Sequence, residues 1–78
     1  MHVYILRSEA VPVRYYVRLT EDITKRLEIH NSGSVPHTSK FRPWKVQTSI
    51  SFSEPTKATA FEKYLKSGSG RVFSKRHF

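Results

Sequence analysis

A basic residue and a titratable residue share one face of a helix that the sequence predicts over residues 21–31. Thr20 is a good N-cap for this segment, EDITKRLEIHN, and Gly33 is well placed to end it. Arg26 and His30 lie four residues apart within it, so their side chains are neighbours. An arginine can clamp a phosphate group, and a histidine can take or position a proton near neutral pH. The alternative is an ordinary solvated helix face.

A carboxylate in the basic second half of the chain is a candidate metal ligand. Residues 40–78 contain two acidic residues, and Glu54 is explained by its place at the start of a predicted helix. Glu62 has no such explanation, and one carboxylate with substrate phosphate oxygens and waters is a typical arrangement around Mg²⁺. The alternative is an intrahelical ion pair with Lys66, four residues further along.

Two tyrosines lie on predicted strands, over residues 2–7 and 14–20, which we expect to pair antiparallel. Tyr4 and Tyr16 could each present a phenol at the surface of the sheet. A phenol with a pKa of about 10 is a weak base near neutral pH, so it needs a charged neighbour or a metal-bound water. The alternative is that each tyrosine packs in the core and its hydroxyl finds a hydrogen-bond partner at the edge of the core. Arg18 is predicted on the same face as Tyr16.

The third predicted strand covers residues 44–52 and alternates clearly. We expect one of its faces to carry every second residue of this segment, namely Trp44, Val46, Thr48, Ile50 and Phe52. The preceding segment, 32–43, is polar and rich in turn formers, so it is predicted as a loop. It is long for a compact domain, and such loops are often functional.

The remaining segments predict two further helices. Residues 56–67 carry an apolar stripe of Ala58, Phe61 and Leu65, and the GSG sequence at 68–70 interrupts the helix. Residues 71–78 then form a short basic helix. The predicted order is ββαβαα, an α+β fold in one domain spanning 1–78.

Composition excludes several other kinds of site. The chain has no cysteine, and its four histidines show no zinc-ligand spacing, so a structural zinc site is rejected. No glycine-rich phosphate loop and no nucleophile elbow is present. No apolar run approaches the roughly 18 residues of a membrane span, and the N-terminal run is read as a strand, not a signal peptide. We expect a cytoplasmic protein without a membrane partner.

Charge is unevenly distributed along the 78 residues. The formal net charge is +8; residues 1–39 hold five basic and four acidic residues, whereas residues 40–78 hold nine basic and two acidic residues. The basic residues are interleaved with aromatic ones and cluster in one half of the chain, which favours nucleic-acid contact over a merely soluble basic surface. The residues expected to contact nucleic acid are Arg18, Lys40, Arg42, Lys45, Lys66 and Arg71.

These candidates occur in a specific order along the chain. The order is VYIL at 3–6, YYVRLT at 15–20, Arg26, His30-Asn31, RPW at 42–44, Glu62 and LKSGSGR at 65–71. This series closely resembles the GIY-YIG nuclease superfamily, in particular small stand-alone bacterial members related to the N-terminal domain of the excision-repair endonuclease. The resemblance covers nearly the whole chain. It implies a three-stranded antiparallel sheet flanked by helices and a metal-dependent phosphodiesterase using Mg²⁺ or Mn²⁺.

The resemblance also implies a role for each candidate. Tyr4 and Tyr16 match the tyrosines of the first and second motifs, and one of them, with His30 or through a water, would activate the attacking water. Arg26 would stabilise the extra negative charge. Glu62 would hold one metal ion on the scissile phosphate and the leaving oxygen.

Two positions depart from the family pattern. Val3 and Arg18 stand where the family has glycine. Valine suits a strand. Arg18, in contrast, adds a long charged side chain beside Tyr16. Arg18 could contact a flanking phosphate or occupy the cleft and weaken cleavage. Three functions therefore stay open: a nuclease, a nucleic-acid-binding module of the same fold with feeble or lost catalysis, and a basic RNA-associated protein. A chain of this size would need a protein partner or a dimer for strong sequence specificity.

Overall fold

The computed structural model describes all residues from 1 to 78 and confirms the predicted fold class. Three strands form one antiparallel sheet in the order β2-β1-β3. The elements are β1 (His2–Ser8), β2 (Tyr15–Thr20), α1 (Ile23–Ser32), α2 (Pro36–Ser39), β3 (Trp44–Ser51), α3 (Pro55–Lys66) and α4 (Gly68–His77). The segment predicted as a loop over 32–43 contains the short helix α2, which Pro36 begins. None of the helices is long and apolar enough to cross a membrane.

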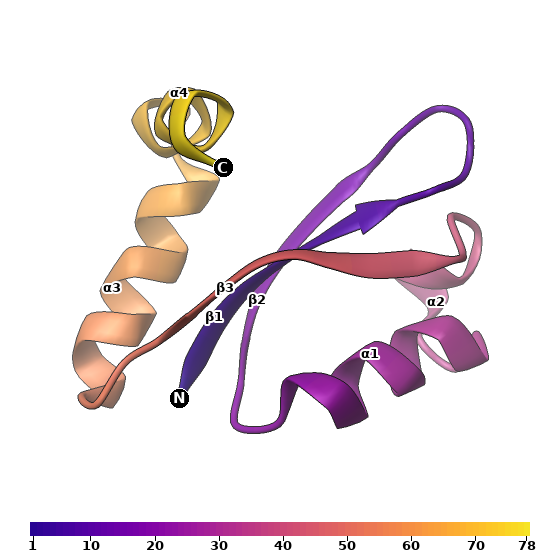
Figure 1. Ribbon diagram of the computed structural model, residues 1–78, viewed down its shortest axis with the longest axis horizontal. Coiled ribbons are helices and arrows are strands. Elements are labelled where there is room, and N and C mark those ends of the chain that lie inside the picture. The colour runs from indigo at the N-terminus through magenta and orange to yellow at the C-terminus, as the bar shows by residue number, and fades with distance from the viewer.

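The central strand β1 separates two small cores. Its side chains alternate, so Val3 and Ile5 pack with Ala58 and Leu65 of α3 on one face of the sheet. On the other face, Tyr4 and Leu6 pack with Trp44 of β3, and Ile23 and Leu27 of α1 join this cluster. Figure 1 shows the same division, with α1 and α2 on one side of the sheet and α3 and α4 on the other.

The prediction that one face of β3 carries five alternating residues is wrong. The pairing of β1 with β3 shifts between Ile5 and Leu6, which face Thr48 and Val46 respectively, so Gln47 is an extra residue. Such a bulge moves the residues beyond it to the opposite face. Trp44 and Val46 accordingly join the core against α1, whereas Phe52 packs in the core against α3.

Helix α1 begins two residues later than predicted. Asp22, not Thr20, is the N-cap, and its carboxylate accepts a hydrogen bond of 3.0 Å from the backbone N–H of Lys25. Thr20 instead makes a local turn with Asp22. The predicted end is confirmed, since Gly33 is the C-cap with φ of 85°, a left-handed conformation that glycine adopts without cost.

Helices α3 and α4 are separated by one residue. Ser67 ends α3, and its side chain accepts a hydrogen bond from the N–H of Gly70 to cap α4. The interruption predicted at 68–70 therefore lies one residue earlier, and α4 starts at Gly68 instead of residue 71. A Cβ on Gly70 would lie 1.7 Å from the carbonyl oxygen of Tyr64, so this close turn requires glycine.

Candidate active site

A buried tyrosine and a buried histidine meet on the α1 face of the sheet. The Tyr4 hydroxyl lies 3.3 Å from Nε2 of His30, and the two residues are 1% and 2% exposed. Tyr4 comes from β1 and His30 from the last turn of α1. Nearly complete burial makes their hydrogen bond important, because a buried polar group without a partner is costly. The structure thus brings together two of the residues that the sequence singled out.

The far side of His30 is held by a residue that the sequence analysis did not select. Nδ1 of His30 lies 2.9 Å from Oγ1 of Thr38, which is itself buried in α2. The indole N–H of Trp44 donates a hydrogen bond of 2.8 Å to the Thr38 carbonyl. The only signal in the sequence was the length of the polar loop that contains Thr38, and burial of one threonine in it could not be predicted.

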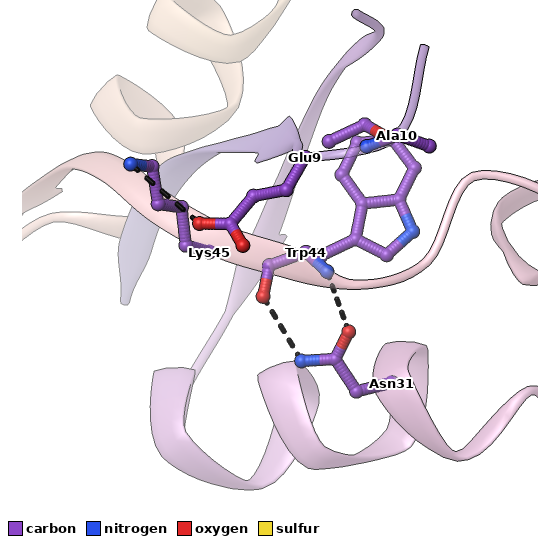
Figure 2. Close-up of polar contacts among 6 residues, drawn as sticks. Glu9, Ala10, Asn31, Trp44 and Lys45 are labelled. Atoms are coloured by element: carbon purple, nitrogen blue, oxygen red, sulfur yellow. Dashed lines mark hydrogen bonds and ion pairs between the residues drawn. The ribbon is translucent and has the colours of Figure 1, made fainter.

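Helix α1 is fastened to β3 directly after His30. The amide of Asn31 donates to the carbonyl of Trp44 at 3.0 Å and accepts from its backbone N–H at 2.6 Å (Figure 2). This pair of bonds occupies both backbone groups of Trp44 as a neighbouring strand would. Because Asn31 follows His30 in the chain, the same contact fixes the end of α1 that presents the histidine to Tyr4.

Tyr16 and Arg18 complete the cluster from the edge strand β2. The rings of Tyr16 and His30 meet edge to face, with centroids 4.9 Å apart. The Arg18 guanidinium lies 5.9 Å from the centre of the Tyr16 ring, within the range of a cation–π contact. In the register of the sheet Arg18 faces Tyr4 directly. Arg18 therefore lies beside Tyr16 with an exposed side chain, at the edge of the cluster.

Two guanidinium groups influence the ionisation of the buried pair. Burial lowers the pKa of His30, and the positive charges of Arg26 and Arg18 lower it further. The pKa of the Tyr4 phenol is raised, first by burial and then by Tyr16, while Arg26 and Arg18 oppose this rise. Both groups are consequently neutral near pH 7. Arg26 lies exposed on α1, one turn before His30, and is close enough to act on both.

Glu62 lies on α3, on the other side of the sheet from Tyr4 and His30. Its carboxylate makes the smallest of the contributions that raise the pKa of Tyr4. Its side chain is 13% exposed, and Oε2 forms an ion pair of 3.3 Å with Lys66. The intrahelical pair weighed from the sequence is thus present, yet Oε1 makes no bond within the protein and is not sealed from solvent. One free carboxylate oxygen suits Mg²⁺, which takes few protein ligands and keeps several waters.

A groove of about 820 Å³ adjoins Tyr16 and Arg18. Lys66 and Arg71 line it, as predicted for residues near a polyanion, and no acidic side chain does. Arg14 and Lys75 also line it, although the sequence analysis did not select them. They lie at the start of the second predicted strand and in the final helix, where nothing in the sequence distinguishes them from other surface cations.

The other predicted cations lie outside this groove. Lys45 lines a neighbouring depression with Arg7, and it forms an ion pair of 3.7 Å with Glu9 (Figure 2). Lys40 and Arg42 follow α2, and Nε of Arg42 donates to the Ser39 carbonyl at 2.9 Å. The structure therefore collects half of the six predicted cations along one groove and leaves the other half elsewhere.

The chain is thus an α+β domain that has a buried tyrosine–histidine contact and a basic groove lined by Tyr16 and Arg18. A family model of the GIY-YIG catalytic domain matches residues 1–76. The chain therefore belongs to the GIY-YIG catalytic domain family. Searches with the chain found no match among curated proteins or solved structures. Members of this family are nucleases that generally depend on a divalent metal, so a nucleic-acid substrate follows at the level of the family.

Proposed function

We propose that this chain is a metal-dependent endonuclease domain that hydrolyses phosphodiester bonds, with DNA as its substrate. The observation that carries the proposal is the buried contact between Tyr4 and His30, flanked by the charges of Arg18 and Arg26. A neutral histidine beside a phenol is suited to proton transfer, and nearby guanidinium groups stabilise negative charge. Action in DNA repair stays a prediction from the resemblance, and a cytoplasmic location stays a prediction from the sequence.

Each residue has one task in this mechanism. Nε2 of His30 takes the Tyr4 proton, and the resulting phenolate, directly or through Tyr16, takes a proton from the attacking water. The water oxygen bonds to phosphorus as the bond to the leaving oxygen breaks. Tyr4 then gives the proton taken from the water to the leaving oxygen, and Nε2 of His30 returns its own proton to Tyr4. Arg26 stabilises the extra negative charge on the phosphate. Glu62 would hold the metal, which when bound stabilises charge on the phosphate and the leaving oxygen.

The basic groove supports nucleic acid as the substrate. Arg14, Arg71 and Lys75 lie along it, away from the tyrosine–histidine contact, so they can hold flanking phosphates while the scissile phosphate lies at the site. Phosphate contacts position a nucleic acid without reading its sequence. We therefore expect salt-sensitive binding of nucleic acid to which each of these side chains contributes. Any strong sequence specificity would come from a protein partner or a second copy of the chain.

A second candidate function has its own support in Arg18. Directly opposed residues on paired strands have Cβ atoms about 4.5–5.5 Å apart, so the Arg18 side chain adds cover beside Tyr4, which is only 1% exposed. A glycine there would leave the phenol more open. The alternative is thus a nucleic-acid-binding module of this fold in which Arg18 weakens or abolishes cleavage.

The test is cleavage of duplex, branched and single-stranded DNA and of RNA, with and without Mg²⁺ or Mn²⁺. We expect metal-dependent cleavage that Glu62→Gln abolishes and Arg26→Ala lowers by about 10²–10³-fold. Glu54→Gln is a matched control for the first variant, because Glu54 is also paired with a lysine on α3 but is well exposed. Lys25→Ala is the matched control for Arg26→Ala, since it removes another cation from the same helix.

The outcomes separate the two candidates. Cleavage by Glu62→Gln at the wild-type rate would exclude Glu62 as the metal ligand. Cleavage by Arg18→Gly alone would establish a competent site that Arg18 blocks and would favour the binding module. Salt-sensitive binding without product from either protein would contradict the nuclease proposal.

A further inference from the structure

Three buried side chains form a continuous hydrogen-bonded chain. It runs from the Tyr4 hydroxyl to Nε2 of His30 at 3.3 Å, and from Nδ1 of His30 to Oγ1 of Thr38 at 2.9 Å. Oγ1 of Thr38 then donates to the carbonyl of Val35 at 3.4 Å. The three side chains come from β1, α1 and α2, so residues far apart in the sequence meet in one line.

Counting donors fixes the direction of this chain. If the Thr38 hydroxyl donates to Val35, its oxygen accepts from Nδ1–H of His30, and the lone pair of Nε2 accepts from the Tyr4 hydroxyl. All three protons then have acceptors. In the opposite direction His30 would donate from Nε2, and the buried Tyr4 proton would have no acceptor in the protein. Leaving a buried donor unpaired is costly, so the first direction is favoured.

Thr38 is held firmly enough to impose this direction. Its carbonyl accepts the Trp44 indole N–H, and its own backbone N–H donates to Val35 at 3.2 Å. Trp44 is in turn bound at both backbone groups by Asn31, the residue after His30. The helix that presents the histidine and the helix that presents the threonine are therefore fixed to the same tryptophan.

We propose that Thr38 is a positioning residue that keeps His30 in the Nδ1–H tautomer, with the Nε2 lone pair facing the Tyr4 hydroxyl. The use of this tautomer in proton transfer rests on the proposed function, whereas the tautomer itself does not. In the transfer the O–H bond of Tyr4 breaks and an Nε2–H bond forms, which leaves a phenolate and an imidazolium. The imidazolium keeps its Nδ1–H bond to Thr38. Tyr4 passes the proton of the attacking water on to the leaving oxygen, and Nε2 of His30 then returns its proton to the phenolate, which restores both groups.

The first measurement needs no activity. Nitrogen-15 NMR of the wild-type chain at about pH 8, where histidine is neutral, reports which ring nitrogen of His30 carries the proton. We expect the proton on Nδ1. Thr38→Val keeps the branched shape and removes the hydroxyl, so we expect the proton to move to Nε2 or to be shared. Thr38→Ser restores the hydroxyl and should restore the wild-type tautomer.

Thr59→Val is the matched control. Thr59 lies exposed on α3, and its hydroxyl bonds only to the Pro55 carbonyl at 3.0 Å, so the same substitution there removes a helix back-bond without touching His30. The tautomer should stay unchanged in this variant. A wild-type His30 with its proton on Nε2 would overturn the inference, as would an unchanged Nδ1–H tautomer in folded Thr38→Val.

The second measurement is cleavage. The Thr38 variants are made in the wild-type chain or, if the wild-type chain does not cleave, in Arg18→Gly. Thr38→Val should lower kcat by about 10–100-fold, the range for losing an outer hydrogen-bond partner of a functional histidine, and Thr38→Ser should recover most of it. Besides Thr38, the groups that face His30 are Tyr4, Tyr16, Arg18 and Arg26, and the Thr38 substitutions leave each of them as it is in the parent protein. Absence of cleavage with the expected tautomers would count against the proposed function and leave the role of Thr38 in setting the tautomer intact.

Discussion

The two faces of the sheet are built from the same three strands but differ in polarity. The core against α3 consists of apolar residues, with Val3, Ile5, Ala58 and Leu65 at its centre. The three buried polar residues of the chain, Ser8, His30 and Thr38, all lie on the α1 and α2 side. Ser8 donates its hydroxyl to the carbonyl of Phe41 there.

This difference shows how a small domain can separate stability from chemistry. Apolar burial stabilises the fold without special geometry, whereas buried polar groups cost free energy unless each has a partner. On the α1 face each of the three buried polar side chains has a hydrogen-bond partner, and these bonds hold Tyr4 and His30 in one arrangement. The α3 face supplies stability in its core and contributes Glu62 and the cations of the groove from its surface.

The largest expected effect on stability comes from overpacking the α3 side of the sheet. Gly70→Ala would place a methyl group against the backbone of Tyr64 and Leu65, so we expect the free energy of unfolding to fall by about 1–3 kcal/mol or more. Gly68→Ala is the matched control, because nothing lies within 4 Å of the added carbon. Urea denaturation measures both. Equal stability of the two variants would show that the turn between α3 and α4 is not tightly packed.

A smaller effect on stability is expected when acid protonates His30 on the α1 side of the sheet. The folded-state pKa of His30 lies below its unfolded value, so the unfolded chain binds more protons in acid. Its contribution to stability is complete above about pH 6.5 and is lost as the pH falls toward the folded pKa, with a slope of at most about 1.4 kcal/mol per pH unit.

His30→Gln tests this slope directly. Urea denaturation between about pH 7 and pH 5 should show a shallower loss of stability in this variant than in the wild-type chain. His37→Gln, at an exposed position on α2, should keep the wild-type slope. The same slope in all three proteins would mean that His30 is not held neutral by its surroundings.

The sequence was most informative where local patterns decide the structure. Strand alternation and the glycine after α1 predicted the element order and the end of that helix, and the ordered motifs predicted that Tyr4, Tyr16 and His30 would meet. The face switch at Gln47 was not predictable, because a bulge depends on how β3 pairs with β1 and not on its own alternation. Thr38 was missed for a related reason: its burial comes from contacts with residues distant in the chain.

The most direct test of the central claim is cleavage by Tyr4→Phe, measured with metal in the parent that cleaves, wild type or Arg18→Gly. Removing one hydroxyl leaves Nε2 of His30 unpaired, so we expect a loss of about 1–3 kcal/mol in stability and a folded protein. Cleavage should fall by about 10²–10⁴-fold, because the phenol takes part in proton transfer. Tyr64→Phe, at an exposed position on α3, should cleave like its parent. Cleavage by folded Tyr4→Phe at the parent rate would contradict the account.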